Sequence, residues 1–398
     1  RLFRSCPSQL TPAWRENPLA LATRSSPGSG RSSGRMVRII KAFRPCCGDL
    51  IHDFDYVGDR YEFELASIPV QGTPEYELGG QTTAHSKESR LSFDFRNVVS
   101  NTAHGWEFPI RGFLEIDFFD DRDSFRLQPR LRQAYGVIGR VLAGRSWSVT
   151  TDLSALAGTI DFSGGDALYG GRVSQLRWEV KLGDSTKWAV GLEEATASIG
   201  NPLGLEGSDR STLPNLGGRI RWEAPQRAHV QLGVDLFQIE WQGGADGPDD
   251  EELGYGVSLS GHFLLGDDRR DGVYGAATFG SGAAHRVIAL GFDGGNDAVI
   301  TPDGMDAISH TQLYGGYSHY WTDSLNSTLT AAWAELDNAS LQPGNAIHQA
   351  TSAHLNLVWF PYDRISVGVE YMWGKRENKD GADGTAQRLQ FMTKFIFN

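Results

Sequence analysis

The chain has 398 residues, of which 48 are glycine and 40% are hydrophobic, and its mean hydropathy is −0.35. No segment approaches the roughly 18 consecutive apolar residues that a transmembrane helix requires. The net charge of −12 argues against nucleic acid as a partner, because nucleic-acid-binding proteins carry basic surfaces.

The first 47 residues differ in composition from the rest of the chain. They hold eight Arg and one Lys against the single acid Glu16, so their net charge is +8 and that of the remainder is −20. Their best apolar stretch, Leu19–Ala22, is far shorter than the about 7–15 residues of a secretory signal. Met36 could serve as an internal start. We therefore expect residues 1–47 to be a disordered or misassigned leader with no recognisable signal peptide, followed by one domain at 48–398.

From Gly48 onward, short runs of alternating apolar and polar residues are separated by turns rich in Gly, Asp, Asn and Ser. Alternation with a period of two predicts strands with one apolar and one polar face. The first clear runs are Arg90–Arg96, Ile110–Phe118, Phe125–Val137, Arg140–Val149 and Arg172–Val180. Later runs begin near Lys187, Arg219, Ala228, Gly254, Asp271, Ser309, Ser324, His348, Asp363 and Arg388. This count predicts about 16 strands, an even number as in bacterial outer-membrane barrels.

One stretch between the strands stands apart. Thr150–Gly171 is longer than a turn and mixes apolar residues with Asp152, Asp161 and Asp166. We expect it to fold inward onto the wall as a constriction loop. The acidic segment Gly243–Glu252 is expected to be a solvated loop, because its acids lack the spacing of a calcium-binding motif.

The last strand shows the alternation most clearly. One face carries Leu389, Phe391, Phe395 and Phe397, and the other carries Arg388, Gln390 and Lys394. We expect this strand to pair with Gly48–Tyr56 and to close the wall. The predicted fold is therefore all-β: a transmembrane antiparallel β-barrel with an apolar outer face and a polar interior.

Strand parity places a set of charged residues on the inner, pore-lining face. The expected constriction residues are Arg90, Asp94, Arg96, Glu115, Asp117, Arg126, Arg130, Arg132, Arg145, Arg177, Arg219 and Arg221, with Asp161 approaching from the loop. A row of arginines facing a few acids would orient anionic solutes, since planar guanidinium groups bind carboxylates bidentately. The alternative is that these arginines only pair with neighbouring carboxylates and keep the wall rigid.

No catalytic, cofactor or metal site is expected. The chain has no G-x-S-x-G, H-E-x-x-H, P-loop or Rossmann glycine motif, and its histidines are scattered without metal-binding spacing. All three Cys lie at or before position 47, which excludes a disulfide framework in the main domain.

Several stretches resemble the DcaP-like porins of Gram-negative outer membranes, which are associated with the uptake of dicarboxylic acids. They include Leu50–Tyr56, Ala66–Val70, Ser89–Phe95, Leu131–Tyr135, Leu142–Trp147, Ser154–Phe162, Tyr317–Thr328 and Val369–Gly381. The resemblance implies a 16-stranded trimeric pore with an inward-folded loop and passive diffusion. The chain departs from that pattern at Arg145, where a Gln is expected, at Asn326, where a basic residue is expected, and at Asn398, which follows the terminal aromatic Phe397.

We therefore expect an outer-membrane porin, and not an enzyme, that favours small anions such as dicarboxylates. Its expected partners are outer-membrane lipid, lipopolysaccharide, small anionic solutes and two further copies of itself. The alternative is a β-rich carbohydrate-binding surface protein, because 11 Trp and 12 Tyr could bind sugars. Trp178, Trp188, Trp222, Trp321 and Tyr371 fall on apolar strand faces, which favours membrane girdles. A barrel enzyme is a third alternative, but it lacks a signature.

Overall fold

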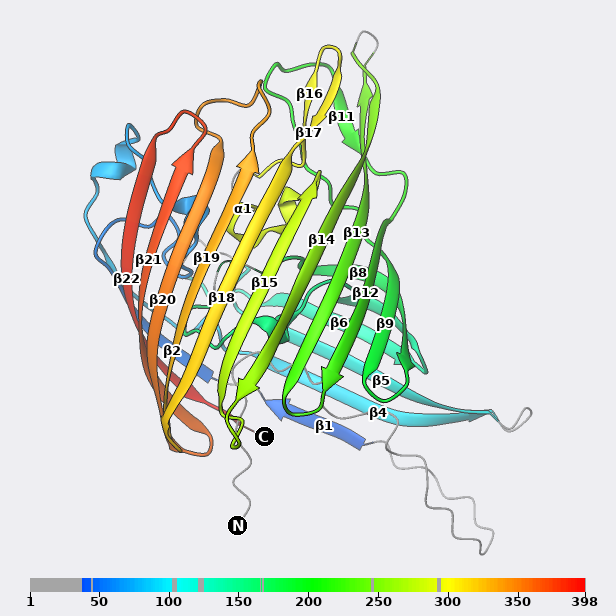
Figure 1. The fold of residues 1–398 in the computed structure, drawn as a ribbon, viewed down its shortest axis with the longest axis vertical. Helices are drawn as coiled ribbons and strands as arrows, with labels where there is room; N and C mark the ends of the chain where they lie inside the picture. Colours follow the sequence, from blue (N-terminus) through cyan, green and yellow to red (C-terminus); the bar gives the residue numbers. More distant parts are fainter. Residues whose placement is uncertain are drawn as a thin grey trace, which may run out of the picture.

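The computed structural model describes residues 38–397, apart from 44–45, 102–105, 121–124, 165, 167, 245–246 and 292–294. Residues 1–37, most of the expected leader, lie outside this part. The described chain is almost entirely β-structure: 19 strands form one antiparallel sheet that curves around an interior (Figure 1). None of its described helices has the length and apolarity needed to cross a membrane.

The strands of this sheet are β1 (Arg38–Phe43), β2 (Cys46–Asp53), β3 (Thr82–His85), β4 (Leu91–Asn101), β5 (Trp106–Asp117), β6 (Arg130–Ile138), β7 (Val141–Trp147), β8 (Arg172–Leu182), β9 (Thr186–Glu193), β11 (Gly207–Arg210), β12 (Asn215–Ala224), β13 (Ala228–Gly243), β14 (Asp250–Leu265), β15 (Asp271–Ser281), β18 (Ser309–Thr322), β19 (Leu325–Asp337), β20 (Ile347–Tyr362), β21 (Ile365–Asn378) and β22 (Asp383–Phe395). A separate three-stranded sheet consists of β10 (Ile199–Gly200), β16 (Ala298–Thr301) and β17 (Gly304–Ala307). The helices are η2 (Leu65–Ser67), η3 (Pro74–Glu77), η4 (Leu153–Ala155), η5 (Ala284–Arg286) and α1 (Ile288–Gly291).

The strand count corrects the prediction of about 16. The second long N-terminal strand is divided into β3 and β4, β1 and β2 lie on either side of residues 44–45, which are outside the described part, and β11 is a short addition beside β13. In the β1–β4 pair Phe43 lies opposite Leu91, and in the β2–β3 pair Asp49 lies opposite His85, so both pairs follow one continuous register. The break at Ser86–Arg90 separates β3 from β4. Sequence alternation could not reveal these divisions, because a break in hydrogen bonding leaves side-chain parity unchanged.

The final strand pairs with the N-terminal part of the chain, as predicted. β22 pairs with β2, from Cys46 opposite Phe395 to Asp53 opposite Arg388. The other edge of β2 pairs with β3. The predicted partner, Gly48–Tyr56, is shifted slightly, since β2 ends at Asp53. Paired strands begin at Arg38, ahead of the domain start expected at Gly48.

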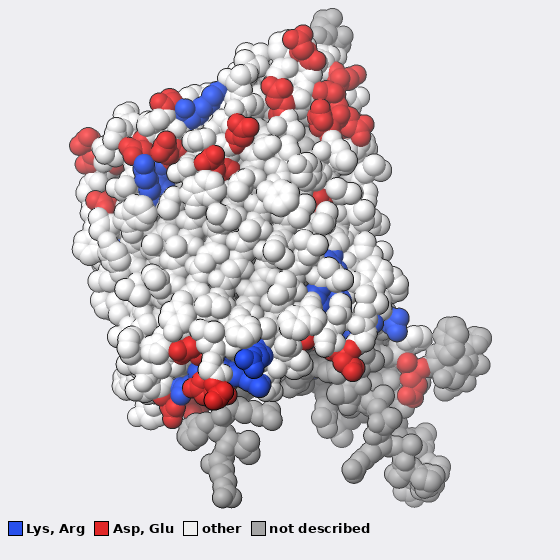
Figure 2. All heavy atoms as spheres, in the orientation of Figure 1, with Lys and Arg blue, Asp and Glu red and all other residues white. Residues whose placement is uncertain are grey.

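The two faces of the sheet have opposite chemistry. On β20 to β22 the outer face carries half-exposed apolar side chains such as Leu355 (53% exposed) and Phe391 (45%), whereas Gln390 and Arg388 on the inner face are fully buried. Figure 2 shows the consequence on one face: a broad middle band is almost free of Lys, Arg, Asp and Glu, and most charges gather above and below it. This is the pattern expected where a barrel wall contacts lipid.

The described residues of three connecting segments, 54–81, 148–171 and 282–308, fold back against the inner face. Phe63 and Leu65 from the first pack with Val287 and Leu290 from the third, and Met372 of β21 belongs to the same buried cluster. The middle segment, 148–171, is the predicted inward loop. Burial against the wall explains why it is rich in Ala and Leu despite being a connection.

Candidate functional site on the inner wall

The first charged cluster on the inner wall is built by β4 and β5. Asp94 is buried between two arginines: Arg111 donates to it at 2.9 and 3.0 Å, and Arg96 donates at 2.8 Å. The register explains the contact, because Arg96 of β4 lies opposite Arg111 of β5. Two guanidinium groups thus contact one carboxylate in this cluster.

A second cluster joins β5 and β6. Arg130 binds Asp117 bidentately, at 3.0 and 2.9 Å, and Arg132 bridges Glu115 at 3.2 Å and Asp117 at 2.5 Å. Arg132, Glu115 and Asp117 are almost completely buried. The prediction that these residues share one face is correct. Here each arginine has a carboxylate partner, as the alternative interpretation of arginines paired with neighbouring acids expects.

Further along the wall, two arginines connect the strands to the inward loop. Arg219 of β12 binds Glu179 of β8 and donates to the carbonyl of Val149 at 3.1 Å. Arg221 donates to Asp152 of the loop at 2.8 Å and to Ser154 Oγ at 2.9 Å. These side chains therefore hold the loop to the wall.

Two arginines have no carboxylate partner within the described part of the chain. Arg90, in the break between β3 and β4, lies 5.4 Å from the ring centre of Phe162. Arg172, at the start of β8, lies 5.0 Å from the ring of Trp147, and its Nη1 is buried without a hydrogen-bond partner. Arg177, also expected on this face, is buried on β8. Because Arg90 and Arg172 have no carboxylate partner among the described residues, they add positive charge to the β4–β8 wall beyond that of its paired clusters.

Phe162 is the loop residue that meets the arginine wall. Arg130 and Arg132 lie 5.8 and 5.1 Å from its ring centre, and Phe119 packs on it at 4.4 Å. Asp161 was expected in this position. It points the other way, where its carboxylate accepts hydrogen bonds from the backbone of Phe63 at 2.9 Å and of Ser163 at 3.0 Å.

Two other expected site residues are placed differently from the prediction. Arg126 is exposed in the connection before β6, because that strand begins only at Arg130. Arg145 lies on the outer face, since Leu142 and Ser146 of the same strand are buried on the inner face and Arg145 pairs with exposed Ser174. The prediction exchanged the inner and outer faces of the run Arg140–Val149, because a shift of one residue moves every side chain to the other face.

Two of the three loop carboxylates, Asp152 and Asp161, differ in ionisation. Burial opposes ionisation of Asp152, but the nearby His229, 2.6 Å away, and Arg221 outweigh it and hold the pKa of Asp152 well below its usual value. Burial raises the pKa of Asp161 to about 7, against the opposing charge of His354. Asp152 is thus an anion at neutral pH, whereas Asp161 is partly protonated there.

Sequence reasoning missed the residues that hold the far end of the loop. Glu370 of β21 and His354 of β20 are fully buried on the inner face, and Asp166 of the loop lies 3.1 Å from His354. Strand alternation already indicates that the side chain of Glu370 points to the face opposite that of its apolar neighbours Val369 and Tyr371. A single acidic residue in such a run is the sequence feature that could have identified Glu370.

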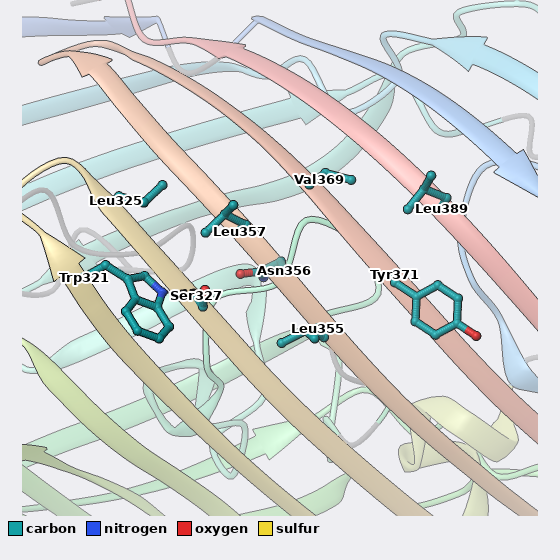
Figure 3. Close-up of a pocket in the computed structure, with 9 residues that line it drawn as sticks. All are labelled: Trp321, Leu325, Ser327, Leu355, Asn356, Leu357, Val369, Tyr371 and Leu389. Atoms are coloured by element: carbon teal, nitrogen blue, oxygen red, sulfur yellow. Dashed lines mark hydrogen bonds between the residues drawn. The ribbon is translucent and has the colours of Figure 1, made fainter.

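The outer face carries the predicted aromatic residues. Trp178, Trp222, Trp321 and Tyr371 are 40–61% exposed there. Figure 3 shows a shallow hollow on this face between Trp321 and Tyr371, lined largely by leucines such as Leu355 and Leu357. Its apolar lining suits lipid and not a hydrophilic solute, and the exposed aromatics are spread over separate strands and not gathered as a sugar platform.

Comparison with known proteins agrees with this geometry. The sequence model of the DcaP outer membrane protein family matches residues 49–397. No curated protein matches the sequence. The crystal structure of the outer membrane channel DcaP of Acinetobacter baumannii is similar over 93% of this chain and 100% of that one, with a TM-score of 0.78 and 21% identity.

More distant structures share the fold. An anion-selective porin from Comamonas acidovorans matches 91% of this chain and 100% of its own, with a TM-score of 0.58 and 11% identity. The trimer form of OmpT from Vibrio cholerae matches 91% and 99%, with a TM-score of 0.53 and 11% identity. Because the family match spans nearly the whole described wall, the chain belongs to the DcaP outer membrane protein family and is a porin of the bacterial outer membrane.

Proposed function

We propose that this porin is a passive diffusion pore for small hydrophilic solutes and that it favours small anions such as dicarboxylates. The observation that carries the proposal is the excess of arginine on the wall from β4 to β8. Asp94 has two arginine partners, and Arg90 and Arg172 have no carboxylate partner among the described residues. A fixed positive surplus at a narrow point attracts anions and repels cations.

We infer that the wall closes on itself and spans the membrane. β2 pairs with β22 along one edge and with β3 along the other, so the last strand meets the N-terminal part of the sheet. A closed wall has no unpaired backbone edge in contact with lipid, where each unsatisfied group costs several kcal/mol.

The inward loop would narrow this pore on one side. It is held against β13, β14, β18, β20 and β21, and Phe162 reaches the arginine wall. Solutes would then pass beside the arginines, not along the centre. A dicarboxylate suits this path because guanidinium forks bind carboxylates bidentately in an environment that is drier than bulk water.

We further propose that the porin works as a homotrimer whose outer face contacts lipid and lipopolysaccharide. The charge-free band of the outer face supports contact with lipid (Figure 2), and the trimer form of OmpT offers an analogy for assembly. Unboiled, membrane-extracted protein should migrate on a denaturing gel as a trimer or compact monomer band that boiling abolishes. No heat-dependent shift in any detergent would contradict this part of the proposal.

Planar-bilayer recording tests the selectivity. Under a salt gradient, the reversal potential of the unmodified pore should show anion preference, and Arg90→Ala and Arg172→Ala should each move it toward cations. Arg145→Ala is the matched control, because it removes the same charge from the outer face. Cation preference in the unmodified pore, left unchanged by both inner-wall substitutions, would refute the anion proposal.

A further inference from the structure

The inward loop is held at its tip by one fully buried carboxylate, Glu370 of β21. This side chain accepts hydrogen bonds from two successive backbone amides of the loop, Ile160 N at 2.6 Å and Asp161 N at 3.1 Å. Asn356 Nδ2 donates to it at 2.9 Å, and His354 Nδ1 lies 3.2 Å away. Hydrogen bonds to a buried carboxylate are stronger than neutral ones, so this contact dominates the attachment of the tip.

The residues around Glu370 extend the same attachment in both directions along the loop. Asn356 also donates to the carbonyl of Gly158 at 2.8 Å, and His354 Nε2 lies 3.1 Å from Asp166. The carboxylate of Asp161 accepts a hydrogen bond from the backbone amide of Phe63, which belongs to the segment 54–81. Glu370 is therefore at the centre of a network that joins two inward segments to one patch of wall.

The wall under the tip is shaped to admit it. A Cβ atom on Gly368, two residues before Glu370, would stand 2.7 Å from Ile160 Cδ1. A Cβ atom on Gly316 of β18 would stand 2.8 Å from Ala157 Cβ. Such separations are shorter than van der Waals contact. At Gly316 the facing atom is the fixed Cβ of Ala157, so glycine is needed there for the loop to lie this close, whereas at Gly368 a larger residue would displace the end of the Ile160 side chain.

On its other side the described part of the tip meets the arginine wall through Phe162, whose ring centre lies 5.1–5.8 Å from three guanidinium groups and 4.4 Å from the ring of Phe119. Cation–π and aromatic contacts of this kind are individually weak, on the order of 1 kcal/mol. The charge-assisted hydrogen bonds at Glu370 fix the tip on the opposite side, and the position of Phe162 depends on them.

We propose that Glu370 is a positioning residue of the pore: it fixes the tip of the loop, residues 158–163, at its distance from the arginine wall and so sets conductance and selectivity without lining the solute path. This rests on the proposed role of the loop as the constriction. In Glu370→Gln one carboxylate oxygen becomes an NH2 group, so one of the two backbone amides loses its acceptor and the other loses a charged one, and the tip then samples positions nearer to and farther from the arginines.

The test is single-channel recording of Glu370→Gln, which keeps the size of the side chain and removes its charge. We expect the folded variant to show open-channel current noise and brief partial closures, a change of about two-fold in mean conductance, and a shifted reversal potential. Glu335→Gln on β19 is the matched control; its carboxylate contacts Gln349 and not the loop, and its currents should be unchanged.

A second pair of variants keeps the test decisive if Glu370→Gln does not fold. Gly368→Val pushes on Ile160 and leaves Glu370 intact, whereas Gly315→Val adds the same bulk where no atom lies within 4 Å. Open-channel current noise in Gly368→Val, together with its absence in Gly315→Val, would support the proposal. Folded Glu370→Gln or Gly368→Val pores with unchanged conductance, noise and reversal potential would overturn it. An unmodified protein that conducts no ions would instead overturn the proposed function.

Discussion

The buried ion pair at the seam between β22 and β2 makes a quantitative prediction about stability. Arg388 and Asp53 are both fully buried, and the guanidinium donates to the carboxylate at 2.5 and 3.2 Å. It also donates to the carbonyl of Asp59 at 2.7 Å. The pair thus joins β22 to β2, and its bond to Asp59 holds the beginning of the inward segment 54–81.

Arg388→Met keeps the length of the side chain and removes its charge, which leaves the Asp53 carboxylate buried without its partner. Breaking one side of a buried pair costs about 3–5 kcal/mol of the free energy of unfolding. The lost hydrogen bond to Asp59 adds about 1 kcal/mol. In Arg388→Met/Asp53→Leu no charge remains buried, so most of the first loss should be recovered and roughly 1 kcal/mol should persist.

Urea unfolding in detergent, followed by heat-dependent gel migration, measures these differences. The control is Arg270→Met: its pair with Asp323 also has a 2.5 Å contact, but Asp323 is 96% exposed, so the loss should stay below about 1 kcal/mol. Equal losses for Arg388→Met and Arg270→Met, or a double variant no more stable than Arg388→Met, would refute the reasoning.

Three further outcomes are expected. Leu355→Arg places a charge on the apolar outer surface proposed to contact lipid and should lower the free energy of unfolding by about 2–4 kcal/mol in a bilayer, with little effect on conductance; an unchanged stability would contradict the assignment of that face. Because burial raises the pKa of Asp161 to about 7, the attached loop keeps a proton that a detached loop would release above about pH 4. Attachment should therefore weaken as the pH rises toward 7, and channel noise should grow over that range but not in Asp161→Asn; noise independent of pH in the unmodified pore would count against this. Arg132→Ala leaves Glu115 and Asp117 with one arginine and should shift the reversal potential toward cations, so a shift toward anions would contradict the charge balance of that cluster.

The sequence predicted the face of most wall residues because parity is a local property. Asp94, Glu115 and Asp117 lie on the inner face, and Leu114 and Phe391 on the outer one, as their alternation indicated. Prediction failed where the strand itself was misjudged. Arg126 precedes the strand in which it was placed, and Arg145 belongs to a run whose parity was assigned one residue off.

Partner choice was outside the reach of the sequence. Alternation places arginines and acids on one face, but it does not show which arginine pairs with which carboxylate. Pairs such as Arg132 and Asp117 depend on the register between neighbouring strands. For the same reason it could not show that Arg90 and Arg172 lack carboxylate partners within the described chain. The selectivity argument therefore depends on the tertiary structure.

By itself, the sequence determined the class of the protein: a chain of alternating strands, an apolar outer face, a polar inner face and a final strand that pairs with the beginning. Each of these follows from a period of two and from the solvents on either side of the wall. Only the tertiary structure decided how the interior is filled. Glu370 meets Ile160 across 210 positions of sequence, and Phe162, not Asp161, faces the arginines. Such contacts depend on how a loop crosses the interior, and no local pattern of residues encodes that path.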